Sequence, residues 1–91
     1  MSVAQEIRAR LALLQPEHVE LVDESEAHRG HAGYRDGGNT HWRLTIVAPA
    51  FAGKATVARH RMVYQALGDL MQHPIHALAI NARAPDEKDP R

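Results

Sequence analysis

The residues of this chain best suited to chemistry are its histidines, seven in number, because the sequence contains no cysteine. Two of them, His28 and His31, lie among small residues in the stretch EAHRGHAG at 26–33. A neutral imidazole can bind a borderline metal ion, and histidine also exchanges protons near neutral pH. Three interpretations are therefore open: solvated or structural histidines, a metal site, or acid–base catalysis.

Acid–base catalysis is the weakest of the three, because no nucleophile is paired with a histidine. Asp23, Glu24 and Ser25 show no spacing that dictates a catalytic triad. Two histidines alone make an incomplete metal site. Without cysteine, the remaining ligands must come from water, a small molecule or a partner. The residues thus favour a shared metal site that this chain holds weakly or not at all by itself, with solvated or structural histidines as the alternative.

Composition limits the other classes of function. The chain has 91 residues, of which 44% are hydrophobic, so we expect one domain at 1–82 and a polar, disordered tail at 83–91. The formal net charge is zero, which argues against strong non-specific binding of nucleic acid. Charged residues interrupt the first fourteen positions, and no apolar run reaches membrane-spanning length. We therefore expect a soluble, cytoplasmic protein with no membrane association.

The predicted secondary structure follows from hydrophobic spacing and from the prolines that interrupt it. Ser2 and Gln5 form a capping-box pattern at the start of a helix that Pro16 stops. Residues 18–23 and 40–48 alternate apolar and polar side chains, as half-buried strands do. The remaining elements are a short turn within 49–56, a helix from Thr56 to about Gln72, and a strand at 75–82 buried on both faces. The apolar face of that helix carries Val57, Tyr64, Leu67 and Met71, with Val63 and Leu70 beside them.

This order, α-β-β-α-α-β, predicts an α+β domain with a mixed sheet. The last two strands are joined through helix, which favours a parallel pair with a right-handed crossover. The segment between the first two strands, about sixteen residues long, then lies at the edge where the second and third strands begin. That edge would gather four histidines: His28, His31, His41 and His76.

A second group of residues, Lys54, Arg59, His60 and Arg61, lies around the start of the second long helix, after a glycine turn. The free N–H groups of a helix N-terminus attract anions, so this group could seat a phosphate backbone. The alternative is a solvated basic face whose arginines pair with acidic side chains such as Asp23 or Glu24. A single glycine turn and a neutral chain slightly favour the alternative.

The sequence resembles the BolA family over nearly its whole length, from the first helix to Ala82. The matching segments are VDES at 22–25, THWRLTIV at 40–47, FAGKATVARHRMVYQAL at 51–67 and IHALAI at 75–80. The resemblance implies a class II KH-like fold, α-β-β-α-α-β, with a three-stranded mixed sheet and helices packed on one face. The order of elements predicted from the sequence agrees with it.

The resemblance also implies a non-enzymatic function. BolA-like proteins partner monothiol glutaredoxins and share a [2Fe–2S] cluster with the glutaredoxin cysteine and glutathione, in cluster trafficking or iron sensing. The family pattern makes His76 one ligand and His28, four residues after Glu24, the other, with His31 as the alternative to His28. No cluster is expected to stay tightly bound to the isolated chain, which would be a monomer or a weak homodimer.

The family's other activity is DNA binding and transcriptional regulation, linked to stress, cell shape and biofilm. The resemblance implies that the helix carrying Arg59, His60 and Arg61, together with Lys54, would be the DNA-binding surface.

Overall fold

The computed structural model describes residues 2–25 and 38–87. His28 and His31 therefore lie outside the described residues. The elements are α1 (Val3–Leu11), β1 (His18–Asp23), β2 (His41–Val47), α2 (Thr56–Leu67) and β3 (Ala77–Arg83), with short 3-10 turns at Ala12–Leu14, Pro49–Phe51 and Gly68–Met71. Among the residues described, no helix is long and apolar enough to cross a membrane.

The first helix begins where the sequence predicts it. The Ser2 hydroxyl accepts the N–H of Gln5, and the Gln5 side chain accepts the N–H of Ser2 in return. This reciprocal pair satisfies donors that a helix start otherwise leaves without partners. Ile7 and Leu11, one helical turn apart, are fully buried against the sheet and α2. The predicted capping box is confirmed.

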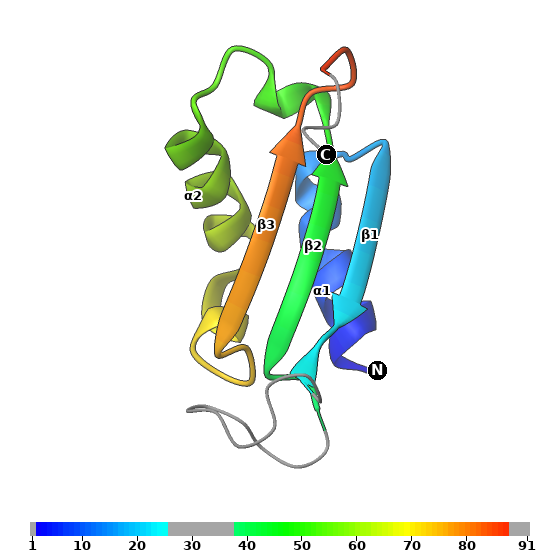
Figure 1. Cartoon of the computed structure of the whole chain (residues 1–91), viewed down its shortest axis with the longest axis vertical. Coiled ribbons are helices and arrows are strands. Elements are labelled where there is room, and N and C mark those ends of the chain that lie inside the picture. The colour runs from blue at the N-terminus through cyan, green and yellow to red at the C-terminus, as the bar shows by residue number, and fades with distance from the viewer. Residues whose placement is uncertain (1, 26–37, 88–91) are drawn as a thin grey trace.

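The three strands form one sheet in the order β1-β2-β3 (Figure 1). β1 pairs with β2 antiparallel, whereas β2 pairs with β3 parallel, in the register His41↔Ala77. A chain that returns parallel to a neighbouring strand needs a long crossover, and α2 supplies it. The predicted topology is confirmed. The end of β1 and the starts of β2 and β3 therefore lie at one end of the sheet, which we call the histidine edge because β2 begins there with His41.

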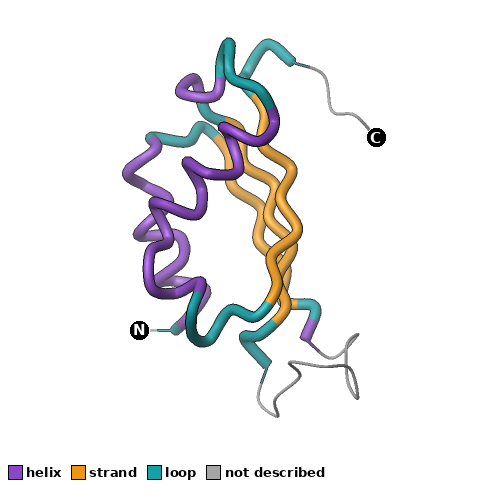
Figure 2. Tube along the Cα trace, turned by 90° about the vertical axis from the view of Figure 1, so that its left-hand side faces the viewer, coloured by secondary structure: helices purple, strands orange, loops and turns teal. Residues whose placement is uncertain are grey.

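The helices cover one face of this sheet and leave the other uncovered (Figure 2). Alternate side chains of the central strand, Trp42, Leu44 and Ile46, point into the layer between sheet and helices and are at most 5% exposed. Their partners in the core are mostly aliphatic: Ile7, Leu11, Phe51, Val63, Leu67, Leu70 and Ile75. The predicted α+β architecture with helices on one face is confirmed.

The second long helix is shorter than predicted. α2 ends at Leu67, because Gly68 adopts φ +57°, and a 3-10 turn follows. Its buried side chains are Val63 and Leu67. Val57 and Tyr64, predicted on the buried face, are 62% and 42% exposed. The predicted face is confirmed at Leu67 and was wrong at Val57 and Tyr64. Several apolar stripes fit this helix, and contact with α1 and the sheet selects the one through Val63 and Leu67.

The third strand also differs from its prediction. β3 begins at Ala77, so His76 precedes the strand, and β3 is an edge strand with Ala77 and Ala79 exposed. It is not buried on both faces, because small alanines made its solvent-facing positions look like core. β3 continues to Arg83, and Ala84 is 1% exposed. Residues 83–87 therefore belong to the folded domain, which corrects the boundary expected at residue 82.

Candidate functional site

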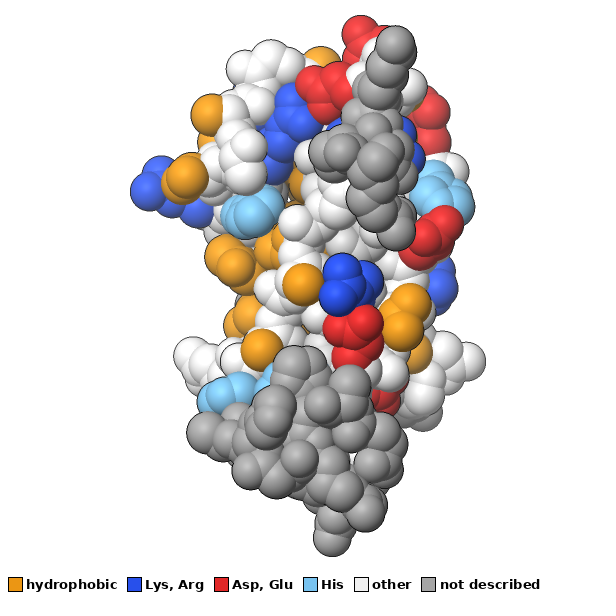
Figure 3. Space-filling model, viewed as in Figure 1, with side chains coloured by type: hydrophobic (Ala, Val, Ile, Leu, Met, Phe, Trp, Pro, Cys, Tyr) orange, Lys and Arg blue, Asp and Glu red, His pale blue; other side chains and the backbone are white. Residues whose placement is uncertain are grey.

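Two histidines meet at the edge where β2 and β3 begin. His41 is the first residue of β2, and the rings of His41 and His76 lie 5.4 Å apart between centroids, tilted by 52°. His41 is 5% exposed, whereas His76 is exposed to solvent. The Thr40 carbonyl accepts the N–H groups of His76 and Ala77, at 2.7 and 3.1 Å. Figure 3, which looks onto the uncovered face of the sheet, shows histidine side chains at this end of the molecule.

A polar clamp of Asp23, Ser25 and Thr40 lies beside these rings. The Ser25 hydroxyl donates to Asp23 Oδ1 at 2.6 Å and accepts the N–H groups of Thr40 and His41, at 3.0 and 3.2 Å. Asp23 Oδ2 accepts the N–H of Asn39 at 3.1 Å. The clamp thus joins the last residues of the β1 side to the residues that lead into β2. The residues that it joins flank the segment 26–37, which contains His28 and His31, and we call them the two stems of that connection.

The clamp also fixes the ring of His41. Thr40 Oγ1 donates to Ser25 Oγ at 3.2 Å and lies 3.0 Å from Nδ1 of His41. The Nδ1 atom of His41 is therefore in hydrogen-bond contact with the Thr40 hydroxyl, which in turn contacts Ser25. A histidine held in this way at one ring nitrogen has a fixed ring orientation.

The Asp23 carboxylate is the charged member of this clamp. Partial burial raises its pKa, but the hydrogen bonds from Ser25 and from the backbone of Asn39 outweigh that effect. The nearby His41 adds a favourable charge interaction. The pKa of Asp23 therefore lies below its ordinary value. The carboxylate stays ionised and keeps accepting hydrogen bonds at neutral pH.

The described part of the chain contains no group of three or more histidine, aspartate or glutamate side chains placed to hold a metal ion. Of the predicted ligands, the structure places His76 at the sheet edge, while His28 and His31 lie outside the described residues. The predicted topology placed His41 at this edge, although His41 was not among the predicted ligands. Its signal in the sequence was its position at the start of a central strand.

The residues of the predicted basic group differ in their exposure to solvent. Lys54 and Arg61 are exposed, whereas the side chain of Arg59 is only 13% exposed. Its guanidinium donates to the carbonyls of Lys54 and Ala82 and forms a two-pronged ion pair with Glu87, at 2.6 and 2.7 Å. The acidic partner of Arg59 is thus Glu87 and not Asp23 or Glu24. Glu24 instead pairs with Arg43 at 2.9 Å.

Proteins of known family share this fold. A structure of the BolA domain of SufE1 from Arabidopsis thaliana superposes with a TM-score of 0.83 at 39% identity, covering 97% of this chain and 99% of that one. BolA-like protein 1 of Mus musculus is 42% identical over 80 residues, 87% of this chain. A DNA-binding transcriptional regulator BolA of Vibrio cholerae is 40% identical over 73 residues, 80% of this chain.

The chain spans 56% of the length of the mouse protein and 65% of the Vibrio protein. The family model described as BolA-like protein matches residues 11–87, which covers both the histidine edge and the ion pair of Arg59 with Glu87. With a matching family model over most of its length and relatives at 40% identity or more, the chain belongs to the BolA-like family.

Proposed function

We propose that this protein is a non-enzymatic partner of a monothiol glutaredoxin in the cytoplasm, and that the two share a [2Fe–2S] cluster. The observation that carries the proposal is the meeting of His41 and His76 at the stem of the connection that bears His28 and His31. The sequence has no cysteine, so the thiolate ligands would come from the glutaredoxin and from glutathione. A bound cluster supplies a transferable or redox-active iron centre.

The residues of this edge fit that group. His76 is exposed, so a partner protein can reach its imidazole, and its backbone is held by the Thr40 carbonyl. A second ligand, His28 or His31, would approach from a connection whose two stems the clamp of Asp23, Ser25 and Thr40 holds together. Two imidazoles leave half of the usual four ligand positions to a partner. That incomplete set supports a cluster shared between chains.

Histidine ligands have two chemical consequences. They raise the reduction potential of a cluster relative to thiolates alone. They also make binding depend on pH, because only a neutral imidazole can be a ligand. Both consequences suit a cluster that is passed on or sensed, in iron–sulfur trafficking or in iron and redox sensing.

The test is to reconstitute the protein with a monothiol glutaredoxin, glutathione, iron and sulfide, and to record visible absorption and circular dichroism. His76→Ala should change the spectrum and shorten the lifetime of the cluster. His18→Ala is the matched control, because His18 is an exposed histidine at the opposite end of β1. If His76→Ala and His18→Ala both give the wild-type spectrum, the ligand assignment is wrong.

The same reconstitution identifies the second ligand. His28→Ala and His31→Ala, each compared with wild type, should differ, because only one of them would remove an iron ligand. We expect His28→Ala to alter the visible circular dichroism and His31→Ala to leave it unchanged. The reverse result would assign the position to His31.

DNA binding is the second candidate function, favoured by the similarity to the Vibrio DNA-binding regulator and by the exposure of Lys54 and Arg61. Fluorescence polarisation against salt tests it on labelled duplex DNA. Lys54→Ala/Arg61→Ala should flatten the slope of log affinity against log salt by about 0.9 for each phosphate that is no longer neutralised. The control variant Arg8→Ala/Arg43→Ala removes the same number of positive charges outside this surface. An equal change of the salt slope in the two double variants would argue against Lys54 and Arg61 as the DNA-binding surface.

A further inference from the structure

The outer edge of β3, its long side facing away from β2, is the less protected of the two strand edges of the sheet. β3 is seven residues long, contains no proline and carries its only charge at the last position, Arg83. The other edge strand, β1, carries Glu20 and Asp23, and Arg8 donates to the carbonyl of Val19. Folded proteins usually guard strand edges with charges, prolines or covering elements, because an open edge pairs readily with another chain.

The hydrogen bonds of β3 to its neighbours show which main-chain groups it has already used. The N–H of Ala77 donates to the carbonyl of Thr40 at 3.1 Å, and the carbonyl of Arg83 accepts the N–H of Ala48 at 3.1 Å. Successive residues of a strand turn their main-chain groups to opposite edges, so the odd-numbered residues of β3 bond to β2. The even-numbered residues therefore turn their N–H and carbonyl groups to the outer edge.

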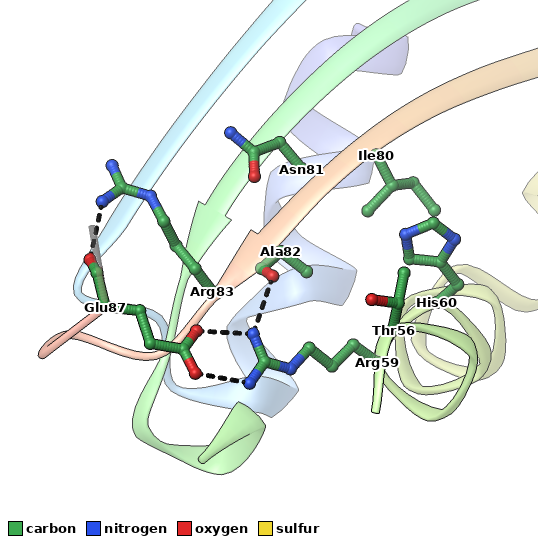
Figure 4. A pocket seen from close by; sticks show the side chains of 8 residues that line it. All are labelled: Thr56, Arg59, His60, Ile80, Asn81, Ala82, Arg83 and Glu87. Atoms are coloured by element: carbon green, nitrogen blue, oxygen red, sulfur yellow. Dashed lines mark hydrogen bonds and ion pairs between the residues drawn. The ribbon is translucent and has the colours of Figure 1, made fainter. Parts of the chain in front are cut away.

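One of these outward groups has a partner from outside the sheet. Nη1 of Arg59 donates to the carbonyl of Ala82 at 3.1 Å (Figure 4). Within the described part of the chain, no hydrogen bond reaches the outward groups of Leu78 and Ile80. Each of these two residues thus offers one N–H and one carbonyl to a neighbouring strand.

A groove between α2 and the outer edge of β3 gives such a strand its space. Figure 1 shows α2 beside β3, past the edge of the sheet, and Figure 2 shows the helices in a layer of their own. A pocket of about 370 Å³ opens between the two elements. Thr56 and His60 line it from α2, and Ile80 and Ala82 line it from β3, with His60 beside Ile80 (Figure 4). Alternate side chains of a strand laid along β3 would therefore enter the pocket under α2.

The charges around the groove favour an acidic strand. α2 and β3, the elements that flank the groove, carry Arg59, Arg61 and Arg83 but no acidic residue. The turn after β3 adds Asp86 and Glu87, and Glu87 is already paired with Arg59 at 2.6 and 2.7 Å. The walls of the groove thus keep a net positive charge, which is complementary to a segment that carries carboxylates.

Two other occupants fit this edge less well. A nucleic acid is also negatively charged, but its backbone has no alternating N–H and carbonyl groups to pair with Leu78 and Ile80. A second copy of this chain would bring its own α2 over the same edge, where the two helices would meet with like charges. A single extended segment needs only the width of one strand, about 4.8 Å from β3.

We propose that the outer edge of β3 and the groove under α2 form a docking site for an extended acidic segment of a partner protein, which adds to the sheet as a fourth strand. The main chain of the segment pairs with Leu78 and Ile80, and its apolar side chains enter the pocket. Its acidic side chains lie along the uncovered face, to which Arg83 belongs because Ile80 and Ala82 face the core. This docking needs no cluster, so it is independent of the function proposed above.

Solvent-exchange NMR tests the docking site with two synthetic peptides, each roughly eight residues long. One peptide alternates valine with glutamate, and the other alternates valine with lysine. At about ten times its dissociation constant, the Val–Glu peptide should slow the exchange of the Leu78 and Ile80 N–H groups about tenfold, because these groups exchange only in the free protein. The Val–Lys peptide should bind more weakly, because its charge matches that of the groove.

Arg43 provides a matched pair of variants, because it lies opposite Val22 on one side and Ala79 on the other. Ala79→Glu and Val22→Glu each add one carboxylate at an exposed position beside Arg43. Ala79→Glu should weaken binding of the Val–Glu peptide by about threefold or more, because like charges on neighbouring strands repel. Val22→Glu, at the far edge of the sheet, should leave the affinity unchanged.

Equal losses in the two variants, equal binding of the two peptides, or unchanged exchange at Leu78 and Ile80 would each overturn the proposal. Protection of these N–H groups by a single-stranded oligonucleotide but not by the Val–Glu peptide would assign the edge to nucleic acid instead. Exchange that slows with protein concentration alone would assign it to a second copy of this chain. The comparison of the two peptides on the wild-type chain stands even if a variant fails to fold.

Discussion

The imidazole of His76 lies against that of His41, with 5.4 Å between the ring centroids, although α2 separates the two residues in the sequence. The parallel pairing of β2 with β3 produces this relationship, because it aligns His41 with Ala77, the residue after His76. The buried ring of His41 therefore supports the exposed ring of His76. The stability of this edge, and of the elements that hold it, can be tested at four positions.

The first prediction concerns Ser25, whose side chain joins the stems of the connection between β1 and β2. Ser25→Ala leaves the N–H groups of Thr40 and His41 without their side-chain acceptor, in a region that is at most 5% exposed. An unsatisfied buried donor costs about 1–3 kcal/mol, so we expect a loss of unfolding free energy in that range. Urea denaturation measures it. A loss below about 0.5 kcal/mol would show that the clamp is not stabilising.

The second prediction concerns the pH dependence of the ion pair between Arg59 and Glu87. The hydrogen bond from Arg59 lowers the pKa of Glu87 from its ordinary 4.5 to about 2, with help from the N–H of Ala84. A carboxyl whose pKa falls on folding contributes stability above its unfolded pKa, and that stability is lost as pH falls through the folded pKa. The contribution of Glu87 should therefore be complete at neutral pH and decline between about 4.5 and about 2.

Urea unfolding of wild type and Glu87→Gln at several pH values measures this contribution. The difference in unfolding free energy should be constant from pH 7 down to about pH 5 and then shrink toward pH 3. The Glu24→Gln control should show a smaller difference, because Glu24 pairs with a side chain of Arg43 that is 59% exposed. A difference for Glu87→Gln that grows as the pH falls would contradict the prediction.

The third prediction concerns Gly68, which ends α2. Its φ of +57° and ψ of −128° lie where side chains are disfavoured, and an added Cβ would lie 3.3 Å from Nη1 of Arg10. That Arg10 nitrogen donates to the carbonyl of Leu67 and to Asp69, both at 2.7 Å. Gly68→Ala should therefore cost roughly 1–3 kcal/mol of unfolding free energy, measured by urea denaturation. Gly53→Ala, which shares a positive φ but has open space around its Cβ, should cost less.

The fourth prediction concerns Asp23, the charged end of the clamp. Asp23→Asn keeps the size of the side chain but removes the charge that accepts from Ser25 and Asn39. Hydrogen bonds to charged groups contribute about 1.5–3 kcal/mol each, so the variant should be less stable to urea at neutral pH. Because folding lowers the pKa of Asp23, the deficit should shrink as the pH falls below the ordinary value of 3.8. A deficit independent of pH would assign the effect to packing instead.

Local patterns in the sequence determined much of the fold. Ser2 and Gln5 specify the start of α1, and the alternation in HVELVD at 18–23 specifies β1 with its observed bounds. A helix between two strand patterns then makes β2 and β3 parallel neighbours, which brings His41 and His76 to one edge. The elements follow from the spacing of residues that are close in the sequence, and their arrangement follows from the rule for crossover connections between parallel strands. Both can therefore be inferred from a single sequence.

The tertiary structure decided which faces are buried and which charges are paired. Alanines in β3 look alike whether they face the core or solvent, and only the position of the strand at the sheet edge exposes Ala77 and Ala79. The pairing of Arg59 with Glu87 joins residues that no local pattern connects. Burial and ion pairing depend on what packs across space, so the sequence by itself named the histidines of the edge, while the folded chain determined that Arg59 faces Glu87 inside a pocket.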